Sequence, residues 1–267
     1  ESQIEAGMMW QKLHRVSKKY GLEADTTSFV TLDGSIEVML VEITNKAGHE
    51  IEITPVGVIP IYGRSADNIR DHRHVTSLLH RIKTTEYGVE VTPTLSFDER
   101  GHQKNNVSYF VYGATGEEGK PQGFYPTVED FIGEGGSFLI PEAVRTDKKV
   151  CSSGTEMQGK EAVGAIRFEK KTVKPGETIS YIMLAGLTDR DSDINKLTKK
   201  YRTAIAVKEE LAAVKKHWID KVNISFETGD SDVDNYLKWI CFQPELRRIY
   251  GCSFLPHHDY GKGGRGW

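Results

Sequence analysis

The residues best suited to chemistry lie near the end of the sequence. Arg248 carries a guanidinium, a fixed and permanently charged fork that matches phosphate oxygens. The glycine-rich loop beyond it carries Lys262, Arg265 and Trp267. Glycines let the backbone approach a ligand closely, a tryptophan offers an apolar face to a sugar, and basic groups bind sugar hydroxyls. Two simpler interpretations stay open: Arg247 and Arg248 form an exposed helical pair, or the loop is a basic segment without a ligand.

His257, His258 and Asp259 stand just before these glycines. Adjacent histidines do not easily ligate one ion together, so we expect no metal here. Hydrogen bonding to a sugar, or ordering of the loop, explains these side chains better. The cysteines also lack the paired spacing of a zinc site. We therefore expect neither a metal nor another cofactor.

A second polar cluster follows a predicted strand at residues 64–74. It includes Arg64, Asp71, His72 and His74. So many charged groups would be costly to bury without partners, so the segment should lie at the surface or face a ligand. The alternative is a solvated loop held together by salt bridges.

The elements that must position these side chains are mostly strands. Alternation of apolar and polar residues predicts strands at 35–45, 50–63, 87–97, 106–114, 162–173 and 178–187. The turn at 45–49 between the first two is a hairpin signature. Antiparallel strands at this spacing predict a mainly β fold, a large β-sandwich. Before them, residues 8–20 show apolar positions near helical spacing and predict a short amphipathic helix.

The period changes to that of a helix after Leu187. Residues 189–223 predict two helices or one long connecting helix, with Asp191 or Ser192 as the N-cap. A further helix follows from Ser231, and Pro244 should kink or interrupt it. The sequence thus predicts a sandwich, a helical linker and the first helix of a third unit.

Composition excludes several classes of protein. The 267 residues carry a net charge of −3, which does not favour a nucleic-acid partner. No apolar run approaches the roughly 20 residues of a membrane span. The N-terminus shows no signal peptide, but the sequence lacks an initiator Met, so an upstream targeting segment stays open. Three widely spaced cysteines are unlike a secreted disulfide framework. They indicate reduced thiols and a cytoplasmic protein.

The segment WICFQPELRRIYGCSF (239–254) resembles the opening helix of the catalytic barrel of glycoside hydrolase family 94. In that family an aromatic residue and Gln are followed five residues later by Arg, an apolar residue, an aromatic residue and Gly. The matching positions here are Phe242, Gln243, Arg248, Ile249, Tyr250 and Gly251. The family continues through a glycine-rich loop to an aromatic–Arg–Asp sequence. Here the sequence stops at Trp267, so we expect more of the polypeptide to follow.

The resemblance implies a β super-sandwich over 1–188, a helical linker over 189–226 and the start of an (α/α)6 barrel over 227–267. It implies that Arg248 binds phosphate, and that the loop to Trp267, with Gln243, binds the transferred glucosyl ring. It also implies that the 64–74 cluster faces the acceptor subsites, often across a homodimer.

The activity implied is inverting phosphorolysis of β-linked gluco-oligosaccharides, giving α-D-glucose 1-phosphate. Inorganic phosphate is then a co-substrate, and no cofactor is needed. The residues at 257–260 make the sequence more like members acting on longer chains, the 1,2-β-oligoglucan phosphorylases, than like the cellobiose phosphorylases. No residue matches the family's catalytic acid, expected beyond residue 267, so these 267 residues alone should be inactive. Two alternatives stay open, a non-enzymatic carbohydrate-binding sandwich and an inverting hydrolase of the same architecture.

Overall fold

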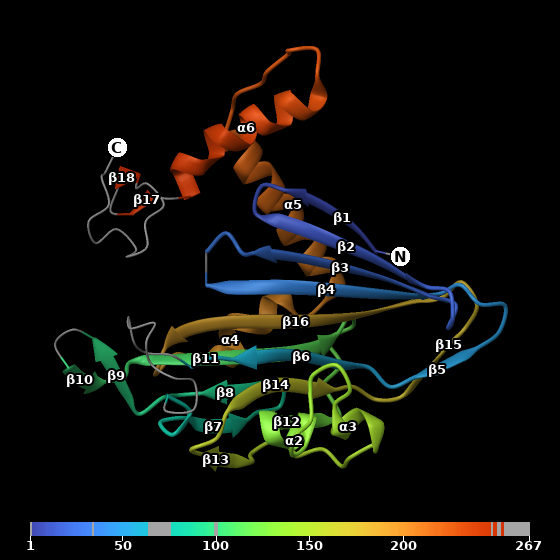
Figure 1. Cartoon of the computed structure of the whole chain (residues 1–267), viewed down its shortest axis with the longest axis vertical. Helices are drawn as coiled ribbons and strands as arrows, with labels where there is room; N and C mark the ends of the chain where they lie inside the picture. The colour runs from blue at the N-terminus through green and yellow to red at the C-terminus, as the bar shows by residue number, and fades with distance from the viewer. Residues whose placement is uncertain are drawn as a thin grey trace.

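The computed structural model describes residues 2–33, 35–63, 76–98, 101–246, 248–249 and 252–253. Within them, nine antiparallel strands form a large sheet in the order β1-β2-β3-β4-β16-β11-β8-β7-β13 (Figure 1). Their bounds in that order are β1 (Ser2–Gly7), β2 (Trp10–Ser17), β3 (Leu22–Val30), β4 (Ile36–Asn45), β16 (Thr178–Asp189), β11 (Val107–Thr115), β8 (Gly88–Val91), β7 (Arg81–Thr84) and β13 (Glu156–Gln158).

A smaller sheet and several short elements complete the described chain. The smaller sheet has the order β12-β14-β6, and three two-stranded pairs accompany it, β5 with β15, β9 with β10, and β17 with β18. Their bounds are β12 (Gly123–Thr127), β14 (Ala162–Arg167), β6 (Val56–Ile61), β5 (Ile51–Ile53), β15 (Lys171–Val173), β9 (Leu95–Asp98), β10 (Gly101–Lys104), β17 (Arg248–Ile249) and β18 (Cys252–Ser253). The helices are α2 (Val128–Ile132), α3 (Glu142–Arg145), α4 (Ile194–Thr198), the 3-10 turn η1 (Lys199–Tyr201), α5 (Ala204–Lys221) and α6 (Ser231–Leu246).

The two sheets pack face to face over an apolar core. The large sheet contributes Val111, Tyr181 and Met183, and the smaller sheet contributes Ile166. The sheets approach closely at Gly164, where an added Cβ would overlap the side chain of Val111. Burying a large apolar side chain stabilises a fold by roughly 1.5–3 kcal/mol, so this core holds the sandwich together. The mainly β sandwich predicted from alternation is confirmed.

Helices cover both outer faces. On the free face of the large sheet, Val207 and Val214 of α5 are fully buried against a core that includes Ile182 and Leu184 of β16. On the outer face of the smaller sheet, α2 and α3 form a separate core around Phe131. The described chain is therefore layered as helix, large sheet, small sheet and helix (Figure 1).

Arg202 fastens the helical segment to the large sheet. Its side chain is 4% exposed, and its guanidinium carbon lies 3.7 Å from the ring centroid of Tyr87. Nη2 donates to the backbone carbonyl of Asn195 and to the Thr198 hydroxyl, both at 2.8 Å. One buried cation therefore joins α4, the start of α5 and the turn before β8.

A second tie lies in the loop between β3 and β4. Asp33 accepts hydrogen bonds from the Thr31 hydroxyl and from the backbone N–H of Ser35, and faces Lys200 of η1 at 3.4 Å. Burial alone would raise the pKa of the Asp33 carboxyl. The hydrogen bonds and the lysine outweigh burial and lower that pKa to about 2.

The last helix rests on α5 through aromatic packing. Phe242 of α6 is fully buried, and its ring centroid lies 5.1 Å from that of Trp218. α6 includes Pro244 and ends two residues later, so the expected interruption does not occur at the proline itself. None of the helices in the described residues is long and apolar enough to cross a membrane.

The predicted helix at 8–20 is wrong. Trp10–Ser17 is strand β2, paired along its length with β3. The sequence of β2 does not alternate between apolar and polar residues as a strand usually does. The reason is that Lys12 and His14 lie on a face that apolar side chains usually occupy. Both are satisfied by Asp25 across the strands, with N–O distances of 2.7 Å. Cross-strand charge pairs stabilise such a surface even without apolar residues.

Two further expectations are corrected. Residues 35–45 and 50–63 do not form a hairpin, because β4 pairs with β3 and β16 while β6 pairs with β14 in the other sheet. The N-cap of α4 is Asp193, not Asp191 or Ser192. Its side chain accepts a hydrogen bond from the backbone N–H of Lys196. The helical stretch after Leu187 is divided into α4, η1 and α5, as one of the two sequence alternatives predicted.

Candidate functional site

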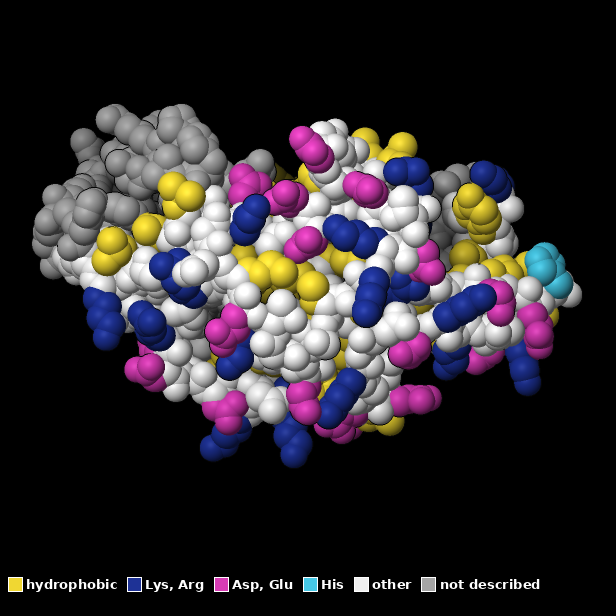
Figure 2. Space-filling model, turned by 90° about the horizontal axis from the view of Figure 1, so that it is seen from below, with side chains coloured by type: hydrophobic (Ala, Val, Ile, Leu, Met, Phe, Trp, Pro, Cys, Tyr) yellow, Lys and Arg dark blue, Asp and Glu magenta, His cyan; other side chains and the backbone are white. Residues whose placement is uncertain are grey.

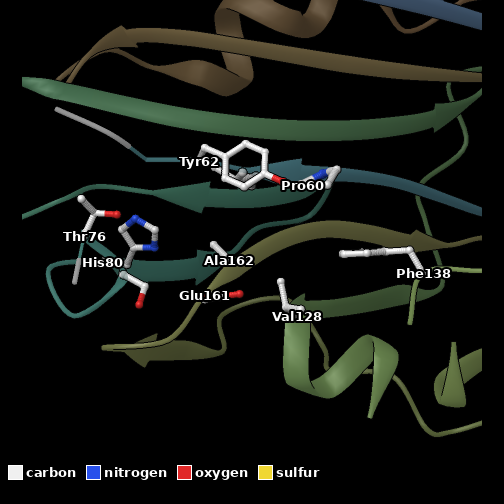
Figure 3. A pocket seen from close by; sticks show the side chains of 10 residues that line it. Pro60, Tyr62, Thr76, His80, Val128, Phe138, Glu161 and Ala162 are labelled. Atoms are coloured by element: carbon white, nitrogen blue, oxygen red, sulfur yellow. The ribbon is translucent and has the colours of Figure 1, made fainter. Parts of the chain in front are cut away.

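A pocket of about 430 Å³ opens at one end of the smaller sheet (Figure 3). Four separate stretches of chain converge on it: the end of β6, the residues before β7, the start of β14, and the segment around α2. Its lining residues are Pro60, Ile61, Tyr62, Thr76, Ser77, His80, Val128, Phe138, Glu161 and Ala162. The volume lies within the range of about 300–1,000 Å³ typical of small-molecule sites.

Two aromatic rings are exposed at this pocket. Tyr62 follows β6 directly and is 56% exposed, and Phe138 is 43% exposed. Phe138 is held from behind, because its ring centroid lies 6.1 Å from that of the buried Phe131 in α2. A backbone bridge between Ser137 and Ile140 also closes the turn that carries it. The pocket therefore exposes two aromatic side chains to solvent, and that of Phe138 is held in place by its neighbours.

Polar groups gather near the other end of the pocket. His80 is 3% exposed, and its ring nitrogens face the backbone carbonyls of Gly63 at 3.3 Å and Lys160 at 3.2 Å. Burial lowers the pKa of His80, against the opposing effects of the two carbonyls and the Glu161 carboxylate. Burial thus favours the neutral imidazole, which has one N–H and donates to only one of the two carbonyls.

The backbone around Glu161 fixes the floor of the pocket. The carbonyl of Glu161 accepts a hydrogen bond from the backbone N–H of Val128 at 2.9 Å. The Thr127 hydroxyl caps α2 by accepting from the backbone N–H of Asp130. Figure 3 shows the Glu161 side chain between Ala162 and Val128. These bonds join β14 to α2, so the two walls are held at a set separation.

The chemistry of the described lining suits binding rather than catalysis. It contains one carboxylate, that of Glu161, and no lysine or arginine. Hydrolysis with inversion uses two carboxyl groups about 6.5–9.5 Å apart, and this lining supplies one. Within the described residues no cluster of His, Cys, Asp and Glu is fit to hold a metal ion. Acidic and basic side chains are interspersed on the face shown in Figure 2, so this face carries no field of a single sign.

Most of the residues predicted from sequence lie outside the described part of the chain. These are Arg64, Asp71, His72, His74, His257, His258, Asp259, Lys262, Arg265 and Trp267. Gln243 is described; it is half-buried in α6, beside the Phe242–Trp218 packing. For Arg248 the backbone is described, in β17, where it pairs with Ser253 of β18. The hairpin of β17 and β18 lies against α6, which brings Arg248 and Gln243 into one region of the fold.

Sequence reasoning did not single out the pocket residues. Tyr62, His80 and Phe138 are separated by long stretches of chain, and no motif joins them. The one available signal was Phe138, an aromatic residue next to three glycines in a stretch that breaks the strand pattern. The free thiols of Cys151 and Cys241 agree with the expectation of unpaired cysteines for the described part of the chain.

Comparison with known families gives a direct match. The family model described as glycosyl hydrolase 94, supersandwich domain, matches residues 12–204. The chain belongs to glycosyl hydrolase family 94. The match covers the smaller sheet, the large sheet apart from β1 and the start of β2, the Arg202 contacts and every residue that lines the pocket. A search of curated proteins found no match.

One solved structure supports the fold. A bacterial glucoamylase complexed with acarbose is similar with a TM-score of 0.52 and 10% identity, over 91% of this chain and 32% of that one. A provisionally assigned kojibiose phosphorylase from the human microbiome matches 92% of this chain and 24% of its own, at 7% identity and a TM-score of 0.34. The chain therefore spans about a third or less of these matched structures. The first likeness supports the fold alone, and the second is too distant to carry an argument.

Proposed function

We propose that the complete protein catalyses inverting phosphorolysis of β-linked gluco-oligosaccharides, releasing α-D-glucose 1-phosphate. The observation that carries this proposal is the order of the parts. A family 94 supersandwich is followed by helices, and the segment from Trp239 resembles the opening of the family's catalytic barrel. Family 94 is a carbohydrate-active family, and phosphorolysis is the reaction that we propose for this member.

The roles of the residues follow from the needs of the reaction. An oxygen of inorganic phosphate attacks the anomeric carbon from the face opposite the glycosidic bond, while a carboxylic acid protonates the leaving oxygen. We assign Arg248 to the phosphate, because a guanidinium binds its oxygens as a charged fork. Lys262, Arg265 and Trp267 contact the transferred glucosyl ring. The acid lies in a later part of the polypeptide.

Two properties complete the proposal. The thiols of Cys151 and Cys241 are unpaired, which supports a reducing, cytoplasmic setting.

The 64–74 cluster is proposed to approach the acceptor end of the sugar, across a dimer of the complete protein. Size-exclusion chromatography with light scattering of that protein would measure the dimer, and a monomeric enzyme with full activity would contradict it.

The reaction is tested in the synthetic direction with complete protein. Supplied with α-glucose 1-phosphate and a panel of β-linked glucosyl acceptors, it should release inorganic phosphate. Absence of release with every acceptor would refute the reaction. An inverting hydrolase would instead cleave these oligosaccharides at a rate independent of phosphate concentration.

Arg248→Ala separates the roles of the two substrates. A hydrogen bond to a charged group contributes about 1.5–3 kcal/mol, so the KM for phosphate should rise roughly ten- to hundredfold. The KM for the sugar should change much less. Arg247→Ala, which removes the same charge one position earlier, is the matched control. Equal losses toward phosphate and sugar would show that Arg248 is structural.

A non-enzymatic role as a carbohydrate-binding sandwich is the second candidate. The observation that favours it is the pocket, because it lies entirely within the supersandwich and needs no barrel. Sugar binding by these 267 residues, together with no turnover by complete protein, would support this candidate over the enzyme.

A further inference from the structure

We propose that the pocket between β6, β14 and α2 binds one glucosyl unit of a β-linked glucan chain and anchors that chain on the sandwich. The choice of glucan rests on the proposed function. The existence of a neutral-sugar site rests on the pocket itself.

Exposed aromatic surface supports the sugar site. Tyr62 and Phe138 project from different segments of chain, and Figure 3 shows Tyr62 above Ala162 and Phe138 to the right of Val128. The two residues are 56% and 43% exposed, although Phe138 packs against the buried Phe131. In a β-linked glucose unit all ring substituents are equatorial, so both faces of the ring present C–H groups. Such faces pack on aromatic rings, and the Tyr62 hydroxyl leaves a polar edge beside them.

The second argument is the balance of polar groups. Thr76, Ser77 and Glu161 give hydroxyl and carboxylate groups at the lining, whereas the ring nitrogens of His80 face backbone carbonyls. A carboxylate accepts hydrogen bonds and repels anions, and hydroxyls both donate and accept. No described lining residue is a lysine or arginine. The pocket therefore favours a neutral polyhydroxylated ligand over a sugar phosphate or inorganic phosphate.

The third argument is that the walls are set before any ligand binds. His80 is buried and donates a hydrogen bond to one of the backbone carbonyls of Gly63 and Lys160, and the Val128 N–H to Glu161 carbonyl bond fixes α2 to β14. A preformed site loses little conformational entropy on binding, so a small ligand can be held by few contacts.

The position of the pocket suggests its task. The smaller sheet packs on one face of the large sheet, and α5 packs on the opposite face and carries α6. The pocket thus lies across the sheet from the helix that carries Gln243 and leads to Arg248. A glucan held there by one unit stays near the protein, which raises the effective concentration of its other units. Short substrates gain nothing from such an anchor.

The test is calorimetric titration of the 267-residue protein with β-1,2-, β-1,3- and β-1,4-linked glucotrioses, maltotriose and α-glucose 1-phosphate. We expect at least one β-glucotriose to bind with a Kd below about 10 mM, and α-glucose 1-phosphate to bind more weakly. Tyr62→Ala and Phe138→Ala should each raise that Kd about tenfold, equivalent to about 1.4 kcal/mol.

Two matched variants control for general effects. Tyr20→Ala removes a tyrosine of similar exposure, 59%, from the turn between β2 and β3. Leu139→Ala removes the exposed neighbour of Phe138. Both should bind as the parent does, and circular dichroism melts confirm that each variant is folded. A variant that does not fold is replaced by the milder Tyr62→Leu or Phe138→Leu, which keeps apolar bulk but removes the ring.

Several results would overturn the anchor. Among them are no binding of any β-glucotriose, equal losses in the control and pocket variants, and preferential binding of α-glucose 1-phosphate. Kinetics of complete protein separate this proposal from the reaction itself. If the reaction holds, Tyr62→Ala should raise KM for long β-glucans several-fold and leave the disaccharide KM unchanged. If no phosphorolysis occurs but the titration behaves as expected, the reaction fails and the sugar site stands.

Discussion

Replacing Arg202 should show how firmly the helical segment depends on the sandwich. Arg202→Ala removes a buried guanidinium stacked 3.7 Å from the Tyr87 ring centroid and its hydrogen bonds to Asn195 and Thr198. Hydrogen bonds from a charged group contribute about 1.5–3 kcal/mol, and a desolvated cation–π contact about 2 kcal/mol. The desolvation cost of the cation is relieved at the same time. We therefore expect a net loss of about 3 kcal/mol.

Urea unfolding followed by far-ultraviolet circular dichroism measures this loss. With a slope of about 2–3 kcal/mol/M, the midpoint should fall by about 1 M. Arg202→Lys keeps the charge but not the planar fork, so it should lie between the parent and Arg202→Ala. Arg190→Ala, an exposed arginine at the end of the sheet, should change stability by less than about 0.5 kcal/mol.

One result would contradict this role of Arg202. If Arg202→Ala unfolds at the same urea concentration as Arg190→Ala, the buried contacts add nothing beyond their desolvation cost. The link then lies elsewhere, in the apolar packing of Val207 and Val214. If Arg202→Ala loses helical circular dichroism signal at lower urea while the sheet signal is unchanged, the Arg202 contacts stabilise only the helices.

Three further predictions concern the rest of the fold. Asp33→Asn should lower stability near neutral pH: a pKa lowered from 3.8 to about 2 contributes at most about 2.4 kcal/mol, reduced by solvent to about 1 kcal/mol at a side chain 47% exposed. That contribution is present above pH 3.8 and is lost as pH falls from there towards 2, so the parent and variant melting curves should converge at low pH. Gly164→Ala should cost about 1–3 kcal/mol in urea through overpacking between the sheets, whereas Gly48→Ala, with open space around it, should be nearly neutral. Tyr62→Ala and Arg202→Ala should be additive in unfolding free energy within about 0.5 kcal/mol, which a double-mutant cycle measures.

The central strands could be predicted from the sequence because their surroundings are simple. β4, β11 and β16 are flanked by strands on both sides and covered on one or both faces, so their apolar residues follow the period of the pleat. β2 could not, because Lys12 and His14 take core-facing positions and are satisfied by Asp25 from β3. The hairpin failed for another reason: the turn at 45–49 leads from one sheet into the other, and local alternation carries no information on pairing.

The candidate functional residues also fall into those that the sequence could predict and those that it could not. Gln243 and Arg248 were predicted from a local pattern, since they lie near each other on one helix and the hairpin after it, and their roles in binding stay predictions. The pocket was not, since Tyr62, His80 and Phe138 come together only when β6 crosses to the smaller sheet beside β14. No local rule predicts that crossing. The roles of the 64–74 cluster and of the residues beyond Ser253 stay predictions as well.

The large sheet makes two independent sides of the protein. Along β16, Ile182 and Leu184 face the helices, while Tyr181 and Met183 face the sandwich core and the pocket's sheet. A close-packed interior of this kind does not deform continuously, so a ligand in the pocket has no soft route to α6. Anything the pocket does for the reaction must therefore act through the ligand itself, by holding a sugar chain that extends past the edge of the sandwich. The effect of the pocket should therefore appear as a dependence of KM on the length of the sugar chain, and not as a change in the affinity of the barrel for sugar.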